Sequence, residues 1–510
     1  MASSGKHIEI LDTTLRDGEQ MKGVSFTPDE KLTIAKFLLK KINVDRIEIC
    51  SARSSPGELQ SAKDILSWAS KNGLEPRIEI LGFVDGELSV EWASQAGGRT
   101  INLLVKGSLK HLEGQLKQTP KEHMENISKV LLNAKRRKIK ANVYLEDWSN
   151  GIAHSRPYVY KLVEFLLGAG VKRIMLADTL GILSPEETRT YVGAMAKKFG
   201  KAQFDYHGHN DYGLATANAL AAATSGARGI HATVNGMGER AGNAHLAEVV
   251  AVINDMSSFR THVDEKELYE ASRLVERLSG VRSAVNRPII GSNVFTQTAG
   301  VHADGDKKGG LYISKLNAER FGRVTEYALG KLSGRASLEH NLKRIGLELT
   351  KEQKDKVLRR IIDLGDRKSN LSPTDLSYIV SDVLGSPAKK TIEITKVLVP
   401  SGLNMIPTAT VAILFRKEEY SDSATGNGGY DAFMNAIRKI IVDRLGLALP
   451  KLEDYEVTIP PGGKTDALVE TKITWSQEGK VFYTIGVDSD QIMAAIKATE
   501  KMLNVVFQTN

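Results

Sequence analysis

The first 255 residues alternate between short β-rich apolar runs and longer stretches with helical periodicity. Apolar residues recur every three or four positions in 28–42 and 123–138, which is the spacing of an amphipathic helix. The predicted strands lie at 7–13, 45–50, 77–83, 100–105, 140–147, 173–179, 202–209 and 229–236. Eight strand–helix units in about 250 residues predict a (β/α)8 TIM barrel. An open doubly wound sheet is the alternative, but the first turn, TTLRDGEQ, lacks a glycine-rich nucleotide-binding pattern.

The pattern changes twice beyond this predicted barrel. A region with helical periodicity and few strands follows it and contains the loop-rich stretch 291–312. Strands then return in two similar units of three strands and one helix, whose helices lie at 428–441 and 488–503. Because two such short units cannot each bury a core, we expect this duplicated α+β region to pack as one domain. The predicted division is a catalytic barrel (1–262), a helical linker (263–390) and a C-terminal regulatory domain (391–510).

Composition narrows the class of protein. The 69 basic and 61 acidic residues give a net charge of +8 without a basic stripe, so we expect no nucleic-acid partner. No apolar run is long enough to cross a bilayer, so we expect no membrane partner. The only cysteine, Cys50, excludes an intrachain disulfide framework and fits a reducing compartment such as the cytoplasm.

Polar residues gather where the predicted strands end, which is where barrels of this kind place their functional groups. His207 and His209, in FDYHGHNDYG, lie two positions apart on a strand, so both imidazoles face the same side. They are either two ligands of one ion or hydrogen-bonded residues of a polar strand end. The other polar residues that follow strand ends are Arg16, Asp17, Tyr144, Glu146, Asp178, Thr179, Asn235, Glu239, Arg240 and Asn243.

This clustering favours a metal centre. Asp17 would add a carboxylate oxygen to the two imidazoles, and Asn243 could add a carbonyl oxygen. Such a ligand set, without thiolates, fits Mn²⁺, Mg²⁺ or Zn²⁺, and the sequence does not choose among them. A 2-oxo acid could chelate the ion, which would polarise its ketone. Arg16 would then stabilise the oxyanion and Thr179 the carboxylate, unless they serve only as an ion-pair partner and a capping hydroxyl.

Four motifs together resemble one enzyme family. They are TTLRDGEQ (13–20), HGHND (207–211), GERAGN (238–243) and FTQTAGVHADG (295–305). In this order they are similar to the acyl-CoA-dependent 2-oxo acid synthases of the DRE-TIM metallolyase group, which include 2-isopropylmalate, homocitrate and (R)-citramalate synthases. The resemblance implies a homodimer that condenses acetyl-CoA with a 2-oxo acid and hydrolyses the thioester.

The resemblance also implies roles for particular residues. Asp17, His207 and His209 would bind the metal, with Asn243 nearby, and Glu146 is the favoured base. A histidine or tyrosine of the linker, His302 or Tyr312, is the alternative, in which case Glu146 would orient Arg16 or a ligand. Together with Asp304, these linker residues would reach over a barrel, that of the partner subunit, and help to hold acetyl-CoA.

The acceptor is inferred from three residues at strand ends. Leu81, Leu104 and Tyr144 would form a small apolar pocket suited to a methyl group, which favours pyruvate and a citramalate product. The stretches LGFVDG and YLEDWSNG are also most similar to the citramalate synthases of the family. If both leucines only fill the barrel core, 2-oxoisovalerate is the alternative acceptor, with 2-isopropylmalate as the product.

The duplicated C-terminal region resembles the allosteric module of the family. For a citramalate-forming enzyme the expected effector is isoleucine, and Tyr430, Asp431 and Asp466 are the candidate contacts, unless they serve only as turn residues. Three other functions are less consistent with the sequence. An acyl-CoA lyase would need a cysteine in a glycine-rich loop. A biotin-dependent carboxyltransferase would need a lysine as a metal ligand. A basic scaffold protein would leave the polar residues at the strand ends unexplained.

Overall fold

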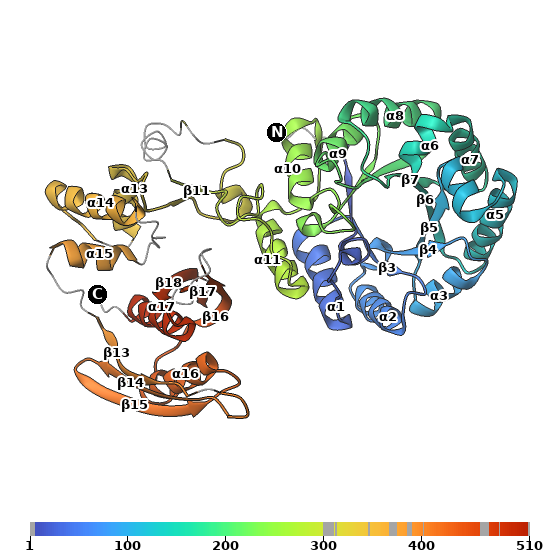
Figure 1. Ribbon diagram of the computed structural model, residues 1–510. Helices are drawn as coiled ribbons and strands as arrows, with labels where there is room; N and C mark the ends of the chain where they lie inside the picture. Colours follow the sequence, from blue (N-terminus) through green and yellow to red (C-terminus); the bar gives the residue numbers. More distant parts are fainter. Residues whose placement is uncertain are drawn as a thin grey trace. The chain divides into compact units, whose positions relative to one another are not determined.

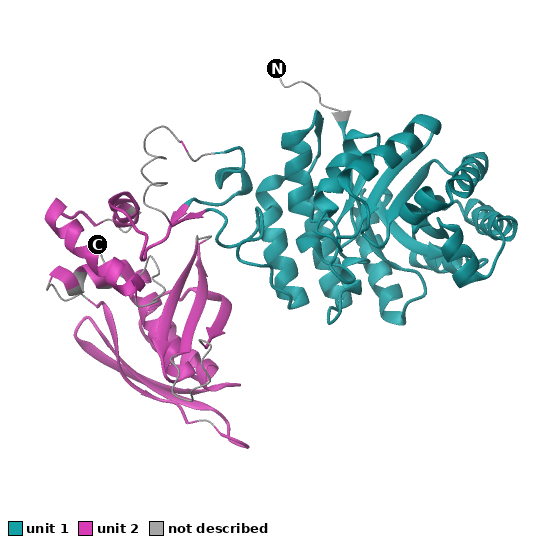
Figure 2. Cartoon of the chain, turned by 45° about the horizontal axis from the view of Figure 1, so that its top comes forward, with its two compact units in different colours: residues 1–295, 314–325 teal, residues 296–313, 326–510 magenta. Residues whose placement is uncertain are grey.

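The computed structural model describes residues 6–298, 311, 314–344, 347–366, 375–384, 390–400, 402–459, 469–478 and 480–507. The chain forms two compact units, which Figure 2 colours separately. The first consists of residues 1–295 and 314–325, and the second of residues 296–313 and 326–510. The division at residues 262 and 390 stays a prediction.

The first unit is built around a closed barrel of eight parallel strands, which confirms the predicted fold class (Figure 1). The barrel strands are β2 (Glu9–Asp12), β3 (Arg46–Ser51), β4 (Ile78–Phe83), β5 (Thr100–Lys106), β6 (Lys140–Glu146), β7 (Arg173–Asp178), β8 (Gln203–Gly208) and β9 (Gly229–Ala232). The barrel closes where Glu9 pairs with Gly229 and Asp12 with Ala232. The carboxyl ends of all eight strands therefore meet at one rim.

Helices surround these strands. They are α1 (Pro28–Phe37), α2 (Pro56–Lys71), α3 (Leu88–Ala96), α5 (Pro120–Arg136), α6 (Trp148–His154), α7 (Arg156–Gly168), α8 (Pro185–Lys198), α9 (Ala215–Thr224) and α10 (Leu246–Met256). Four of them, α1, α2, α5 and α8, begin with the same local signal, Ser or Thr followed by Pro and, two residues later, Glu. In α1 the Thr27 hydroxyl accepts from the Glu30 amide, and the Glu30 carboxylate accepts from the Thr27 amide. This reciprocal cap fixes where α1, α5 and α8 start.

The barrel interior is layered because side chains two positions apart on a strand face the same side. An apolar layer consists of Leu11, Leu81, Leu104, Tyr144, Met175 and Ala177. Two positions earlier on several of the same strands lies a charged group, the basal layer, consisting of Glu9, Arg46, Glu79, Arg173 and Asp205. Asp205 bonds Arg46 and Arg173 at 2.6 Å each, so its buried charge is paired.

Short elements extend the first unit beyond the barrel. Strand β1 (Lys6–His7) pairs in parallel with β10 (Phe259–Arg260), which brings the start of the barrel sequence to its end. Helix α11 (Leu268–Ser279) follows and packs Leu268, Ala271 and Val275 into the main core.

In the second unit, three helices bury a small apolar core that includes Leu338, Val357 and Ile361. They are α13 (Arg335–Arg344), α14 (Lys351–Asp366) and α15 (Asp375–Leu384). Two short strands that precede them in sequence, β11 (Thr296–Gln297) and β12 (Glu326–Tyr327), pair in parallel. The stretch 337–365 has helical periodicity throughout, but it forms parts of two helices, α13 and α14. The reason is a cap in which Thr350 and Gln353 bond each other's amides and start α14.

The rest of the second unit contains the predicted duplication. One half is β13 (Ile392–Leu398), β14 (Thr408–Phe415), β15 (Glu418–Thr425) and α16 (Gly429–Arg438). The other is β16 (Lys451–Thr458), β17 (Val469–Gln477), β18 (Lys480–Asp488) and α17 (Gln491–Val506). Both sheets are antiparallel, and Ile413 and Phe433 share one core with Ile473, Trp475 and Leu503. Among the described residues, no helix is both long and apolar enough to span a membrane.

Candidate active site

Asp17, His207 and His209 lie together at the carboxyl ends of the barrel strands. His207 Nε2 is 3.3 Å from Asp17 Oδ2 and 3.4 Å from His209 Nε2, and His209 Nε2 is 4.0 Å from the same carboxylate oxygen. One donor atom from each residue lies within 4.8 Å of the others, and all three side chains are buried. The spacing of His207 on β8 and His209 directly after it, with the turn after β2, thus produces a compact set of one oxygen and two nitrogens.

Asn243 completes the buried side of this cluster. Its Nδ2 donates to Asp17 Oδ1 at 2.9 Å and to the Met237 carbonyl at 3.0 Å. Its Oδ1 is buried without a hydrogen-bond partner in the described part of the chain. Gly238, at φ +151°, makes room for this amide, because a Cβ there would lie 2.1 Å from Asn243 Nδ2. An unpaired buried oxygen on a residue that bonds Asp17 fits a divalent cation at this cluster.

Arg16 borders the cluster and is held from two sides. Its Nε donates to Glu48 Oε2 at 2.5 Å, and its Nη1 donates to Asp17 Oδ2 at 2.6 Å. Burial opposes the charge of Arg16, but the carboxylates of Glu48 and Asp17 outweigh it and raise the pKa of the guanidinium. Arg16 is therefore a permanently charged, fixed group next to the proposed ligands.

The protonation states of two cluster residues suit metal binding. Burial alone would raise the pKa of Asp17, but Arg16 and His207 outweigh it and hold that pKa well below its usual value. Burial lowers the pKa of His209 to about 4, against the opposing charge of Asp17. At neutral pH the cluster thus offers an ionised carboxylate and a neutral His209 imidazole, the forms that bind cations.

A buried polar chain beneath the cluster includes residues that the sequence did not single out. The Tyr144 hydroxyl lies 3.0 Å from His231 Nδ1, and His231 Nε2 lies 3.4 Å from Asp205 Oδ2. Glu48, which binds Arg16, also accepts from Asn102 at 2.7 Å. A signal for Glu48 exists in the strand RIEIC, where a charged residue stands among apolar ones, and it recurs in the RIEIL that holds Glu79.

The three residues expected around the acceptor side chain are close together. Leu81, Leu104 and Tyr144 belong to the apolar layer inside the barrel, together with Leu11 and Met175. Tyr144 joins this layer to the cluster, because its hydroxyl lies 3.4 Å from Arg16 Nη2. Burial raises the pKa of Tyr144 well above its usual value, so the phenol keeps its proton.

Glu146 and Thr179 lie at strand ends with partners of their own. Glu146 forms an ion pair with Lys106, and the Thr179 hydroxyl accepts from the Asp147 amide at 2.9 Å.

Three further residues of the rim are held by the surrounding loops. The Asp178 carboxylate accepts from two loop amides at 3.1 Å each, Asn235 donates to the Ser272 carbonyl, and Arg240 pairs with Asp211 and Glu239. They support the loops around the rim. His302, Asp304 and Tyr312 of the linker, and Asp466, lie outside the described residues.

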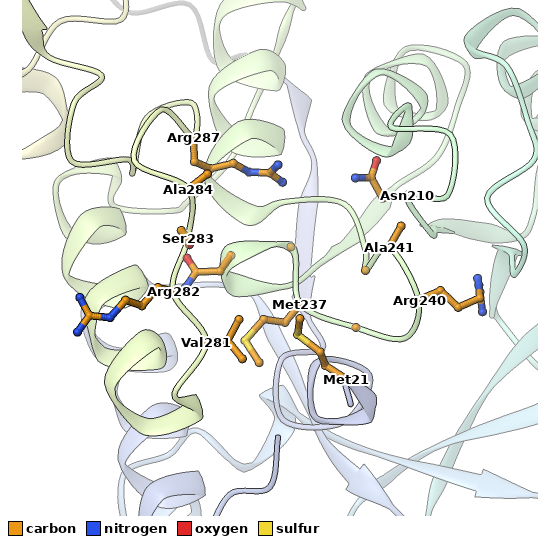
Figure 3. A pocket seen from close by; sticks show the side chains of 14 residues that line it. Met21, Asn210, Met237, Arg240, Ala241, Val281, Arg282, Ser283, Ala284 and Arg287 are labelled. Atoms are coloured by element: carbon orange, nitrogen blue, oxygen red, sulfur yellow. The ribbon is translucent and has the colours of Figure 1, made fainter. Parts of the chain in front are cut away.

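A pocket of about 240 Å³ opens beside the loop that carries Asn243 (Figure 3). Residues 236–238 and 240–242 line one side of it, and the segment after α11 supplies Arg282 and Arg287 on the other. Arg287 also pairs with Glu248 at 3.0 Å. Two arginines therefore line a pocket whose opposite side is the loop that leads directly to Asn243 in sequence.

A second pocket, of about 430 Å³, lies in the C-terminal domain. Tyr430 and Asp431, two of the three expected effector contacts, line it together with Leu452, Tyr455 and Ile492. The Tyr430 hydroxyl bonds Thr499 at 2.7 Å, and Asp431 Oδ2 accepts from the Asn427 amide at 2.9 Å. The pocket thus combines apolar walls with one carboxylate.

The fold and this site define a TIM barrel with a candidate metal centre at its carboxyl-terminal rim. The family model HMGL-like matches residues 7–275, and the chain belongs to this family. Residues 289–369 match the homocitrate synthase post-HMGL domain-like model, and residues 370–507 match the LeuA allosteric (dimerisation) domain.

The curated relatives include two kinds of synthase. The chain is 34% identical over 502 residues to (R)-citramalate synthase CimA of Methanocaldococcus jannaschii, covering 98% of this chain and 99% of the relative. It is 33% identical over 506 residues to 2-isopropylmalate synthase of the same organism, covering 98% and 94%. The 2-isopropylmalate synthase of Aquifex aeolicus is 34% identical over 513 residues, covering 98% and 96%. Sequence identity therefore does not separate the two activities.

Proposed function

We propose that the protein condenses acetyl-CoA with pyruvate and water to give (R)-citramalate and CoA. The observation that carries this proposal is the buried Asp17, His207 and His209 cluster beside Arg16, in a chain of the HMGL-like family. Asp17, His207 and His209, with Asn243 Oδ1 close by, would hold Mn²⁺, Mg²⁺ or Zn²⁺. Such an ion, when bound, supplies Lewis-acid polarisation of the ketone of a 2-oxo acid.

Arg16 and Thr179 would orient and stabilise the acceptor. Arg16 keeps its charge in a buried position, so it can stabilise negative charge that develops on the keto oxygen. The Thr179 oxygen already accepts from the Asp147 amide, which leaves its hydroxyl proton to donate to the substrate carboxylate.

Glu146 is the proposed base that removes a methyl proton from acetyl-CoA. In the structure the Lys106 ammonium binds its Oε2, so proton transfer to this oxygen requires the ion pair to open. His302 and Tyr312 are the alternative acid–base groups.

The choice of pyruvate rests on the apolar layer. Leu81, Leu104 and Tyr144 belong to one apolar cluster, and we propose that the side chain of the acceptor packs against it, which favours a methyl group. An isopropyl group would overpack this layer, at a cost of about 1–3 kcal/mol. The 2-isopropylmalate synthases among the relatives make 2-oxoisovalerate the second candidate acceptor.

We place acetyl-CoA at the rim, and the basic pocket with Arg282 and Arg287 suits its phosphates. His302, Asp304 and Tyr312 of a partner subunit would complete this site in a homodimer. The match to the LeuA allosteric (dimerisation) domain supports such a dimer.

The C-terminal pocket is the proposed site for feedback inhibition by isoleucine. Asp431 would pair with the ammonium group of the amino acid, and Leu452, Tyr455 and Ile492 would contact its side chain. Asp466 is proposed as a further contact.

One experiment tests the proposed reaction. Release of free CoA is measured with pyruvate, 2-oxoisovalerate and other 2-oxo acids, with and without a chelator. The proposal predicts the highest kcat/KM with pyruvate and loss of turnover with the chelator. Faster turnover of 2-oxoisovalerate would show that pyruvate is not the preferred acceptor. Turnover that survives complete metal removal would refute the metal centre.

A further inference from the structure

The first unit holds a second cluster of ligand-type side chains, far from the candidate active site. His7 lies on β1, Asp45 immediately precedes β3, and His262 follows β10. His7 and Asp45 precede the barrel strands β2 and β3, whereas Asp17 follows β2 and His207 lies near the carboxyl end of β8. Because the barrel strands are parallel, the two clusters lie at opposite ends of the barrel.

The geometry of this second cluster brings two imidazole nitrogens to one carboxylate oxygen. His7 Nε2 is 2.9 Å and His262 Nδ1 is 3.0 Å from Asp45 Oδ1. One donor atom of each residue lies within 4.8 Å of the others, and the two rings stack at 3.7 Å. These are the ligand types and the convergence that a first-row divalent ion requires.

Hydrogen bonds to the surrounding chain hold the cluster in place before any ion binds. Asp45 Oδ2 accepts from the Ile10 amide at 2.8 Å, which aims Oδ1 at the imidazoles. Asn43 Nδ2 donates to the His262 carbonyl at 3.2 Å, and Arg77 Nε donates to the Asp45 carbonyl at 3.1 Å. The Asp45 side chain is 15% exposed and the His262 side chain 62% exposed, so water can reach the open side of the site.

We propose that His7, Asp45 and His262 form a binding site for a divalent transition-metal ion such as Zn²⁺, with water as the remaining ligand. A bound ion would cross-link three segments that are distant in sequence: the first strand, the turn before β3 and the chain that leaves the barrel. It would stabilise the folded first unit, because binding to the native state alone shifts the unfolding equilibrium. This site does not depend on the proposed catalytic function.

The test counts zinc ions on the full-length protein after chelator treatment and equilibrium dialysis against micromolar Zn²⁺. The variant His262→Gln keeps a donor for Asp45 but removes a strong ligand, and the exposed His154→Gln is the matched control. We expect His262→Gln to bind one zinc ion fewer per chain than the wild type and the control. Ions at the barrel rim are common to all three proteins, so this difference is independent of the proposed reaction. Equal counts in all three would overturn the proposal.

A measurement on the wild type removes any dependence on the folding of variants. Histidine modification by diethyl pyrocarbonate, mapped by mass spectrometry, is compared with and without Zn²⁺. The site predicts that Zn²⁺ protects His262 and leaves His154 reactive. Unchanged modification of His262 at saturating Zn²⁺ would refute the site.

Discussion

Glu48 accepts a hydrogen bond from Arg16 Nε at 2.5 Å, although 32 positions separate the two residues. The carboxylate fixes the guanidinium that faces the cluster of Asp17, His207 and His209. Glu79 offers a close comparison, because it is equally buried, also binds Asn102, and pairs with Arg46 of the basal layer. The two glutamates thus differ mainly in whether their arginine borders the candidate active site.

Glu48→Gln should therefore lower catalysis, whereas Glu79→Gln should not. Each change leaves a buried arginine short of a carboxylate, so each should destabilise the protein by about 3–5 kcal/mol. Only Glu48→Gln should also reduce kcat/KM for pyruvate, by about tenfold or more, which corresponds to about 1.4 kcal/mol. Activity is measured per folded molecule, and equal losses in the two variants would show that Glu48 has no specific role in placing Arg16.

His207→Ala should remove metal-dependent turnover. The change deletes one of three proposed ligands, so we expect the affinity for Mn²⁺ to fall by more than about 100-fold, since changing groups that only orient a ligand costs 10–100-fold. Mn²⁺ binding is measured by equilibrium dialysis and turnover by release of CoA. The exposed His154→Ala is the control, and near-normal activity of His207→Ala would refute its assignment as a ligand.

Leu81→Ala should relax the choice of acceptor. The smaller side chain leaves space in the apolar layer, so the ratio of kcat/KM for 2-oxoisovalerate to that for pyruvate should rise about tenfold. Ile80→Ala is the matched control, because Ile80 is the neighbouring buried residue of β4 and packs in the main core instead. Both variants should lose about 2–5 kcal/mol of stability. The same ratio in both would place Leu81 outside the acceptor pocket.

The stability of the first unit should depend on pH through His231. Burial lowers the pKa of this residue to about 4, below its usual value of 6.5. In the unfolded chain it takes up a proton as the pH falls through about 6.5, and in the folded chain only near 4. Because the folded chain keeps this imidazole neutral, the free energy of unfolding decreases as the pH falls from about 6.5 to about 4, by up to about 3 kcal/mol. The decrease levels off below pH 4.

This dependence is measured as the free energy of unfolding by urea at several pH values. His231→Gln should flatten the curve between pH 6.5 and 4, while His154→Gln should leave its slope unchanged. An unchanged slope in His231→Gln would mean that His231 is already protonated in the folded protein.

Asp431→Asn should weaken inhibition by isoleucine. The amide still accepts from the Asn427 amide, so the start of α16 is kept while the negative charge in the pocket is lost. We expect the isoleucine concentration for half-inhibition to rise about tenfold or more, as for the loss of a charged hydrogen bond of about 1.5–3 kcal/mol. Asp422→Asn is the control, because Asp422 lies on β15 and pairs with Arg444 outside the pocket. Equal sensitivity in both variants would place the effector elsewhere.

The sequence predicted the features that depend on local periodicity. Eight strands and the shared face of His207 and His209 follow from spacing alone, and the structure brings both histidines to Asp17. The start of α14 at Thr350 does not follow from apolar spacing, because its cap is a weak signal within a long helical pattern. Glu48 and His231 were missed for another reason. Whether a strand residue faces the barrel interior depends on how the strands close around it, which spacing within one strand does not reveal.

The basal layer has a consequence for how this protein can change over generations. Glu9, Glu79 and Asp205 share the charges of Arg46 and Arg173, so replacing either arginine leaves the buried Asp205 short of a cation. We therefore expect a substitution at one of these five positions to persist only when a second substitution restores the balance of charge. That end of the barrel should be inherited as a block, while the opposite rim stays open to single substitutions that alter the acceptor.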